Sequence, residues 1–104
     1  DAAMTRARRK DANHDSLVEL HRRLGWWVED TYQLGQYVAG FPDAIGRHPL
    51  SGIVVFLEFK SDRGKLTKAE EEWREACPCD YEIERAIADV VANHHKYMLA
   101  SSEH

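Results

Sequence analysis

The chain has 104 residues, a hydrophobic fraction of 43% and a formal net charge of −4. This length predicts one domain with a modest core, and the composition is that of a folded protein. No apolar run approaches the ~20 residues that span a bilayer, and no signal-like segment opens the chain, so we expect a soluble intracellular protein without membrane contact. The net negative charge argues against a passive nucleic-acid coat, which is normally basic.

Residues 1–12 are expected to form a basic N-terminal arm, of which residues 1–3 precede Met4 and are interpreted as a remnant of cloning. Arg8, Arg9 and Lys10 are candidate contacts for a nucleic acid, and a disordered leader is the equal alternative. A single domain is expected over residues 13–100, followed by a tail at 101–104.

A helix is expected over residues 11–24, capped by Asn13 or Asp11 and ended by Gly25. Glu19 lies near the edge of its apolar stripe and could point toward a site. The stripe consists of Leu17, Leu20 and Leu24, which recur at helical spacing. Strand-forming residues between Trp26 and Tyr32 predict a first strand of about six residues. Residues 33–39 are expected to form a connection of undefined shape.

The strongest strand prediction covers residues 53–60. A short second strand at 41–45, entered through Pro42, and a turn at 46–52 are expected to precede it. The strand has apolar residues on both faces, which indicates a central strand covered on both sides. One face consists of Ile53, Val55, Leu57 and Phe59, and the other of Val54, Phe56, Glu58 and Lys60.

A second helix is expected to begin at Thr67, which has the spacing of a capping box with Glu70, and to end at Pro78. Residues 80–85 alternate between apolar and charged side chains, which predicts a strand with one solvent-exposed face. Residues 87–100 are expected to form the last helix. The elements follow the order αβββαβα. We therefore expect an α/β (α+β) fold with a mixed central β-sheet flanked by helices.

Asp43 and Glu58 are candidate metal ligands. Hydrolysis of a phosphodiester needs an activated water, a neutralised transition state and a stabilised leaving oxygen, and Mg²⁺ or Mn²⁺ can serve all three. These cations prefer oxygen ligands, and both carboxylates lie at the same end of the sheet if the second and third strands pair. Lys60 follows on the same strand face, roughly 6–7 Å beyond Glu58, where its ammonium could orient the attacking water or meet developing negative charge.

These residues resemble the motif of the PD-(D/E)XK nuclease superfamily. The pattern from Gly40 through Asp43, the strand that ends Glu58-Phe59-Lys60, and the helix opened by Thr67 are similar to its VRR-NUC branch. The resemblance implies a restriction-endonuclease-like core in which Asp43 and Glu58 bind Mg²⁺ or Mn²⁺. It further implies that the Phe59 carbonyl adds a ligand, that Lys60 is catalytic, and that the acid of the first helix falls on Glu19.

The resemblance also implies a function and partners. We expect an endonuclease that recognises DNA structure, plausibly as a homodimer on four-way (Holliday) junctions, in a bacterial or phage-type cytoplasm. Arg63, Lys65 and Lys68 are candidate DNA contacts because they form a basic cluster after the motif. The alternative is a catalytically silent nuclease-fold module that binds nucleic acid or protein.

Glu70 departs from the family pattern, which often has a glutamine that supports the site. Either Glu70 serves the site or it only caps its helix, and the reciprocal partner Thr67 favours the cap. Cys77 and Cys79 are interpreted as idle thiols, because one intervening residue suits neither an unstrained disulfide nor a standard zinc site. His94 and His95 face different directions on their helix, which favours the core edge and solvent over a metal site.

Overall fold

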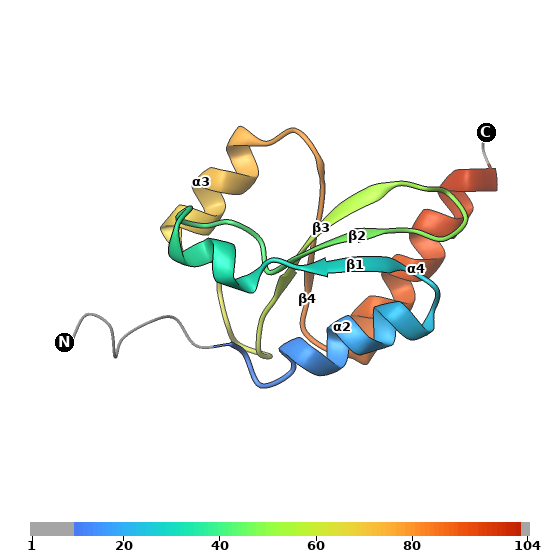
Figure 1. The fold of residues 1–104 in the computed structure, drawn as a ribbon, viewed down its shortest axis with the longest axis horizontal. Coiled ribbons are helices and arrows are strands. Elements are labelled where there is room, and N and C mark those ends of the chain that lie inside the picture. Colours follow the sequence, from blue (N-terminus) through green and yellow to red (C-terminus); the bar gives the residue numbers. More distant parts are fainter. Residues whose placement is uncertain (1–9, 103–104) are drawn as a thin grey trace.

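The computed structural model describes residues 10–102, so Arg8 and Arg9 of the expected basic arm lie outside the described residues. Elements are labelled as in Figure 1. In chain order they are α2 (His14–Arg23), β1 (Trp27–Asp30), the 3-10 helix η1 (Tyr32–Gln36), β2 (Ala44–Arg47), β3 (Val54–Phe59), α3 (Lys68–Ala76), β4 (Asp80–Glu84) and α4 (Ile87–Ser102). No helix within residues 10–102 is both long and apolar enough to cross a membrane.

The four strands form one mixed sheet in the order β1-β2-β3-β4. β1 pairs antiparallel with β2, and β2 pairs antiparallel with β3. β3 pairs in parallel with β4, and α3 makes the crossover that a parallel pair requires. The expected α+β class, with a mixed sheet flanked by helices, is confirmed.

The hydrophobic core lies between one face of the sheet and the helices α2 and α4, which run side by side along it (Figure 1). Val55, Leu57 and Phe59 are fully buried on this face, as the two-residue period predicts. The opposite face is covered less completely: Val54 is exposed, and Trp73 of α3 packs on Phe56. The helices contribute Leu17, Val18, Val90 and Tyr97 to the core.

Buried polar groups join the helices to the sheet. His21 Nε2 lies 2.8 Å from Glu84 Oε1, and both side chains are fully buried. His94 accepts a hydrogen bond from the Trp26 indole at 2.9 Å, whereas His95 is exposed. The prediction of core edge and solvent for the two histidines is confirmed. Because a buried polar group without a partner costs roughly 1–3 kcal/mol, these bonds also fix how the helices dock.

The first helix begins at His14, three residues later than expected. Asn13 occupies the N-cap position, but its side chain does not cap the helix. Its amide Nδ2 instead donates to the carbonyls of Lys60 and Arg85, at 3.2 and 2.9 Å. The capping role expected for Asn13 is therefore wrong, because its side chain joins the helix start to the end of β3.

The first strand is shorter than expected. It ends at Asp30, whose Oδ1 accepts the Tyr32 N–H at 3.0 Å. This side-chain to backbone bond turns the chain away from the sheet and opens η1. Tyr32 therefore belongs to η1 and not to the strand.

The second strand is shifted along the chain, from the expected residues 41–45 to Ala44–Arg47. Gly46, which was expected in a turn, pairs with Val55 inside the sheet. A Cβ at Gly46 would lie 2.9 Å from the Trp26 ring. The glycine makes room for a core tryptophan, so its function is packing and not chain reversal.

We expect Gly40→Ala to lower the free energy of unfolding by about 2 kcal/mol or more. Gly40 has φ +79°, and a Cβ there would lie 2.2 Å from the Ala69 carbonyl oxygen. Urea denaturation gives the measurement. Gly64→Ala is the matched control, because its Cβ would lie no closer than 3.1 Å to any atom, the nearest being the Ser61 hydroxyl oxygen. Equal midpoints for the two variants would contradict the expected clash.

Candidate active site

The pairing of β2 with β3 brings two acids together. Ala44 pairs with Leu57, so Asp43, directly before β2, lies beside Glu58. The sequence prediction required these strands to pair, and they do. Asp43 Oδ2 accepts the Phe59 N–H at 2.8 Å. This bond orients Asp43 toward the end of β3, and both carboxylates are buried, with 3% and 1% of their surface exposed.

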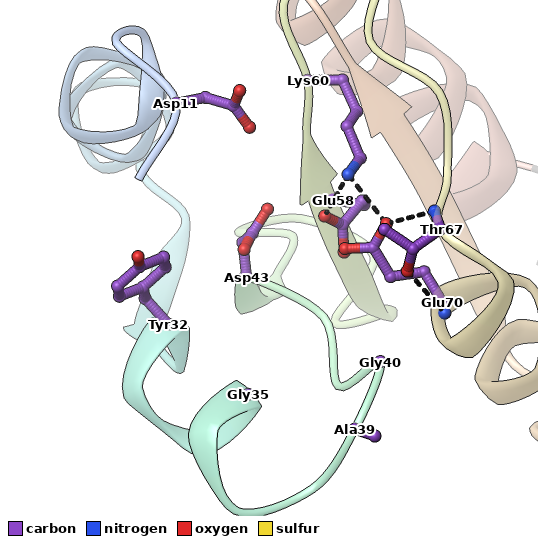
Figure 2. Close-up of a pocket in the computed structure, with 10 residues that line it drawn as sticks. All are labelled: Asp11, Tyr32, Gly35, Ala39, Gly40, Asp43, Glu58, Lys60, Thr67 and Glu70. Carbon is purple, nitrogen blue, oxygen red and sulfur yellow. Dashed lines mark hydrogen bonds and ion pairs between the residues drawn. The ribbon is translucent and has the colours of Figure 1, made fainter. Parts of the chain in front are cut away.

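Both acids line a pocket of about 420 Å³ at the end of β3. In Figure 2 Asp43 stands in its middle, Asp11 and Tyr32 lie on one side, and Glu58, Lys60 and Glu70 lie on the other. Gly35, Ala39 and Gly40 form the wall that comes from η1 and the segment after it, and Thr67 completes the lining. The pocket therefore gathers four carboxyl groups and one ammonium within reach of solvent.

Glu58 is a buried acid with little to balance its charged form. No neighbouring group donates a hydrogen bond of good geometry to its oxygens, and Lys60 Nζ lies 3.7 Å away. The neutral carboxyl can itself donate a hydrogen bond to Asp43. Burial, followed by the charge of Asp43, raises the pKa of Glu58 to about 10. The side chain thus sits where a negative charge is unfavourable unless a further cation joins it.

Lys60 and Glu70 form a tight ion pair at the pocket wall. Lys60 Nζ donates to Glu70 Oε1 at 2.7 Å, and the same oxygen accepts the Thr67 N–H at 2.8 Å. The Thr67 hydroxyl accepts the Glu70 N–H in return, so the expected capping box is confirmed. Glu70 also touches the site, so its two alternative roles are not exclusive.

The same contacts set the charges of this pair. Burial lowers the pKa of Lys60, but the hydrogen bond and charge of Glu70 outweigh it, and the net pKa is raised. Burial raises the pKa of Glu70, but the bonds from Lys60 and the Thr67 N–H outweigh it, and the net pKa is lowered. Lys60 is therefore an ammonium held in place by a carboxylate.

Asp11 is a pocket residue that the sequence analysis considered only as a helix cap. It lies just before α2, and its charge is among the causes that raise the pKa of Lys60. The one signal in the sequence was an acid at the start of the first helix. That signal was ambiguous, because acids are common helix caps.

Glu19, which was expected in the site, lies elsewhere. It is five residues past the start of α2, its side chain is 58% exposed, and it pairs with Arg23 at 3.3 Å. It lines a separate hollow beside Ile87. Because a helix rises about 1.5 Å per residue, only the beginning of α2 reaches the end of β3.

The residues in the pocket fit a hard divalent cation. Asp43 and Glu58 offer carboxylate oxygens from adjacent strand ends, and the unbonded oxygens of Glu58 are groups that a cation would satisfy. The Phe59 carbonyl as an additional ligand stays a prediction. Mg²⁺ and Mn²⁺ suit this donor set better than softer metals, which favour nitrogen or sulfur.

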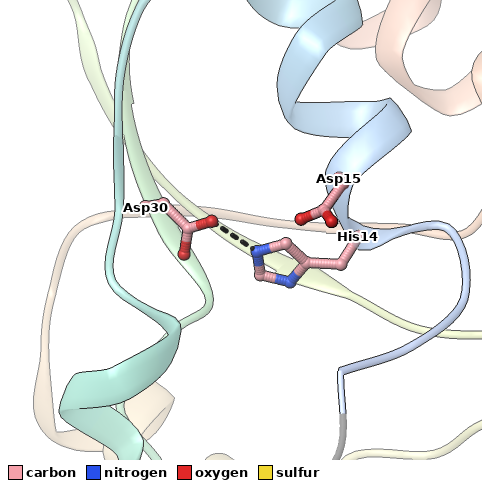
Figure 3. Close-up of side chains that lie close together, drawn as sticks. All are labelled: His14, Asp15 and Asp30. Carbon is pink, nitrogen blue, oxygen red and sulfur yellow. Dashed lines mark hydrogen bonds and ion pairs between the residues drawn. The ribbon is translucent and has the colours of Figure 1, made fainter.

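A second acidic group fits a metal less well (Figure 3). Within residues 10–102, His14, Asp15 and Asp30 are the only three acidic, histidine or cysteine side chains whose ligand atoms lie within 4.8 Å of one another. Lys10 Nζ, however, lies 3.2 Å from Asp15 and 4.0 Å from Asp30. His14 is buried, bonds Asp30 at 3.0 Å and packs edge-on against Phe59. Lys10 therefore balances part of the charge of these acids, and its expected contact with a nucleic acid stays a prediction.

The expected basic cluster follows Lys60 in the chain. Arg63, Lys65 and Lys68 are exposed and form no ion pair with any residue in the range 10–102. Arg85 Nη1 fixes the loop that carries Arg63 and Lys65 by donating to the carbonyls of Ser61 and Gly64, at 2.7 and 2.5 Å. Lys68 is the first residue of α3.

The cysteines lie outside this pocket, in the connection from α3 to β4. Cys77 and Cys79 are free thiols whose Sγ atoms are 2.7 Å apart. Burial, followed by the hydrogen bond with Cys77, raises the pKa of Cys79 to about 12. Cys79 is therefore an unreactive thiol at neutral pH.

We expect Glu58→Gln to increase the free energy of unfolding of the metal-free protein by about 1–3 kcal/mol at pH 8, and therefore to raise its melting temperature. The pKa of Glu58 is raised, so the folded protein holds a proton that the unfolded chain releases, and stability falls as pH rises from about 5 toward 10. Because glutamine does not titrate, this dependence of stability on pH should be absent from the variant.

Thermal unfolding between pH 5 and pH 8, with and without Mg²⁺, gives the measurement. Mg²⁺ should stabilise the parent and not Glu58→Gln, because the variant lacks a charged ligand. A melting-temperature difference that does not change with pH, or an equal response to Mg²⁺, would contradict the assignment of Glu58.

Comparison of the chain with the models of known protein families, with curated proteins and with solved structures finds no match.

Proposed function

We propose that the protein is a divalent-metal-dependent endonuclease that hydrolyses DNA phosphodiester bonds. The observation that carries this proposal is Glu58 in an open pocket, a buried acid whose charged form is opposed by burial, Asp43 and Glu70, with the Lys60 ammonium 3.7 Å away. A buried acid of this kind destabilises the fold, so a ligand that needs it is the simplest reason for its presence. The pattern of Asp43, Glu58 and Lys60 resembles that of VRR-NUC nucleases, and this resemblance also supports metal-dependent hydrolysis of a phosphodiester.

Asp43 and Glu58 would hold the metal, with the Phe59 carbonyl as an expected third ligand. Bound Mg²⁺ or Mn²⁺ would neutralise charge on the phosphoryl oxygens and lower the pKa of a bound water. The Phe59 N–H fixes one oxygen of Asp43 at 2.8 Å. The ligand therefore needs little rearrangement on binding, which favours affinity.

Lys60 is suited to stabilise negative charge on the scissile phosphate or to orient the attacking water. Its Nζ is fixed by Glu70 at 2.7 Å and lies 3.7 Å from Glu58. A held ammonium loses less freedom in the transition state than a mobile one, so it contributes more to the rate. Glu70 positions Lys60, which is the supporting role that the family pattern gives to a glutamine.

Asp11 takes the place proposed for Glu19. It faces Asp43 and Glu58 across the pocket, where its carboxylate could orient a metal-bound water. The role that the resemblance assigns to an acid on the first helix is thus proposed for Asp11, which precedes that helix.

The proposed substrate is DNA with a branched or otherwise exposed structure. The family resemblance supports selection by DNA structure over selection by base sequence. The exposed residues Arg63, Lys65 and Lys68 would contact backbone phosphates. The family resemblance supports a homodimer that aligns two pockets with the two strands of a four-way junction.

We expect Asp43→Asn, Lys60→Ala and Asp11→Asn to reduce cleavage by about 100-fold or more, because each removes a charge that acts on the transition state. Labelled duplexes, flaps and four-way junctions with Mg²⁺ or Mn²⁺ give the measurement. Glu19→Gln is the matched control and should cleave like the parent, because it is exposed outside the pocket. Cleavage by Lys60→Ala at the parental rate would overturn the mechanism, and binding of DNA without cleavage by the parent would favour the silent module.

The two roles of Glu70 can be separated by two substitutions. Glu70→Gln keeps an oxygen for the Thr67 N–H and Lys60 but removes the charge, so stability should change by less than about 0.5 kcal/mol. Glu70→Ala should lose about 1 kcal/mol with the capping box. Both should lower the cleavage rate, Ala more than Gln. Urea denaturation and single-turnover cleavage give the two readouts, and parental cleavage by Glu70→Ala would restrict Glu70 to capping.

A further inference from the structure

Trp26 is a buried side chain surrounded by imidazole rings. It is 3% exposed, and the ring centroids of His21, His48 and His94 lie 4.7, 5.1 and 6.3 Å from its own. The three histidines come from α2, from the connection between β2 and β3, and from α4. His48 and His94 also stack on each other, with centroids 4.8 Å apart. The rings therefore bring three separate segments together around one tryptophan.

His94 can hold its position only as a neutral ring. The indole Nε1 of Trp26 is a donor without acceptor capacity, and it lies 2.9 Å from Nδ1 of His94. Nδ1 must therefore accept this bond, and an imidazolium cannot do so because it carries a proton on both nitrogens. Burial, followed by the charges of three nearby histidines, lowers the pKa of His94. Protonation of His94 thus requires the loss of its bond to Trp26.

His48 is restricted in the same way by its backbone bonds. Its Nδ1 accepts the N–H groups of Leu50 and Ser51, at 3.1 and 3.3 Å. The ring proton is therefore on Nε2, which lies 3.0 Å from the His94 carbonyl oxygen and donates to it. His48 is 1% exposed. A second proton on this ring would break the turn that follows β2 and place a charge among buried groups.

The titratable groups around the two rings leave a positive charge on them unbalanced. His21 on α2, His95 on α4 and Arg47 at the end of β2 are all basic. Among residues 10–102, the histidines that pair with a carboxylate are His14 and His21. The acids of β4 beside α4 already have partners, which are His21 and Asn93 for Glu84, and Lys96 and Tyr97 for Glu82.

We propose that His48 and His94 form a pH-sensitive lock, which holds α4 against the β2–β3 connection while both rings are neutral and opens in acid. The inference does not depend on the proposed nuclease function. Histidines of an unfolded chain bind protons below about pH 6.5, whereas the folded protein has no place for a second proton on these two rings. The contribution of the lock to stability should therefore be fully present above about pH 6.5 and fall as the pH decreases below it.

Nitrogen-15 NMR of the imidazole rings tests the lock without any substitution. His48 and His94 should both carry their single proton on Nε2 at pH 7.5, and the Trp26 indole N–H should be protected from exchange with solvent. Neither ring should gain a second proton while the Trp26 signal keeps its folded position. A proton on Nδ1 of either ring, or an imidazolium in the folded protein, would overturn the proposal.

Urea denaturation between pH 5.0 and pH 7.5 measures how many protons bind on unfolding. The Glu58→Gln background is used because Glu58 has a pH dependence of the opposite sign. In this background the equilibrium constant of unfolding should rise as the pH falls from 6.0 to 5.0. His48→Asn and His94→Asn should each reduce this rise by about tenfold, because asparagine keeps an acceptor oxygen near the Nδ1 position and does not titrate.

His95→Asn is the matched control, because His95 is an exposed neighbour of His94 on the same helix. Its rise in the unfolding constant should match that of the background within about twofold. His14 and His21 are present in every variant, so their contributions cancel in the comparison. A result for His94→Asn equal to that for His95→Asn would overturn the proposal. If an asparagine variant does not fold at pH 7.5, the NMR titration of the parent decides by itself.

Discussion

The antiparallel pairing of β2 with β3 is the constraint on which the site depends. It places Asp43 beside Glu58, although 14 residues separate them in the chain, and the Phe59 N–H then fixes Asp43 at 2.8 Å. A shift of this register by one residue would turn Glu58 into the helix-covered face and Leu57 into the pocket. The buried residues Val55, Leu57 and Phe59 oppose that shift, so the core determines the geometry of the site.

The pocket is destabilising by itself, and the surrounding fold offsets that cost. Glu58 is buried, and burial together with the neighbouring Asp43 disfavours its charged form. Tight contacts surround it: Gly40 lies against the start of α3, and the capping box holds Glu70 against Lys60. Strain concentrated at a site and stability supplied by a core is the usual arrangement in enzymes.

The sequence predicted the residues whose positions follow from local pattern. The face of β3 with Val55 and Leu57 follows from two-residue alternation, and the capping box of Glu70 follows from helical spacing. The pair Asp43 and Glu58 was predicted on the condition that the second and third strands pair, which they do. The errors arose where a residue served a distant neighbour. Gly46 was expected in a turn because nothing local indicates the Trp26 ring that it accommodates.

Asp11 and Glu19 show the same limit. Both are acids on or near the first helix, and the helical pattern alone cannot tell which end of that helix meets the sheet. The sequence by itself determined the third and fourth strands and singled out the acids and the lysine, because backbone sterics and burial act over a few neighbouring residues. Only the tertiary structure decided that α2 reaches the pocket with its first residues, so Asp11 enters and Glu19 does not. The physical reason is helix docking, which depends on contacts such as Asn13 with the Lys60 carbonyl and His21 with Glu84, far apart in the chain.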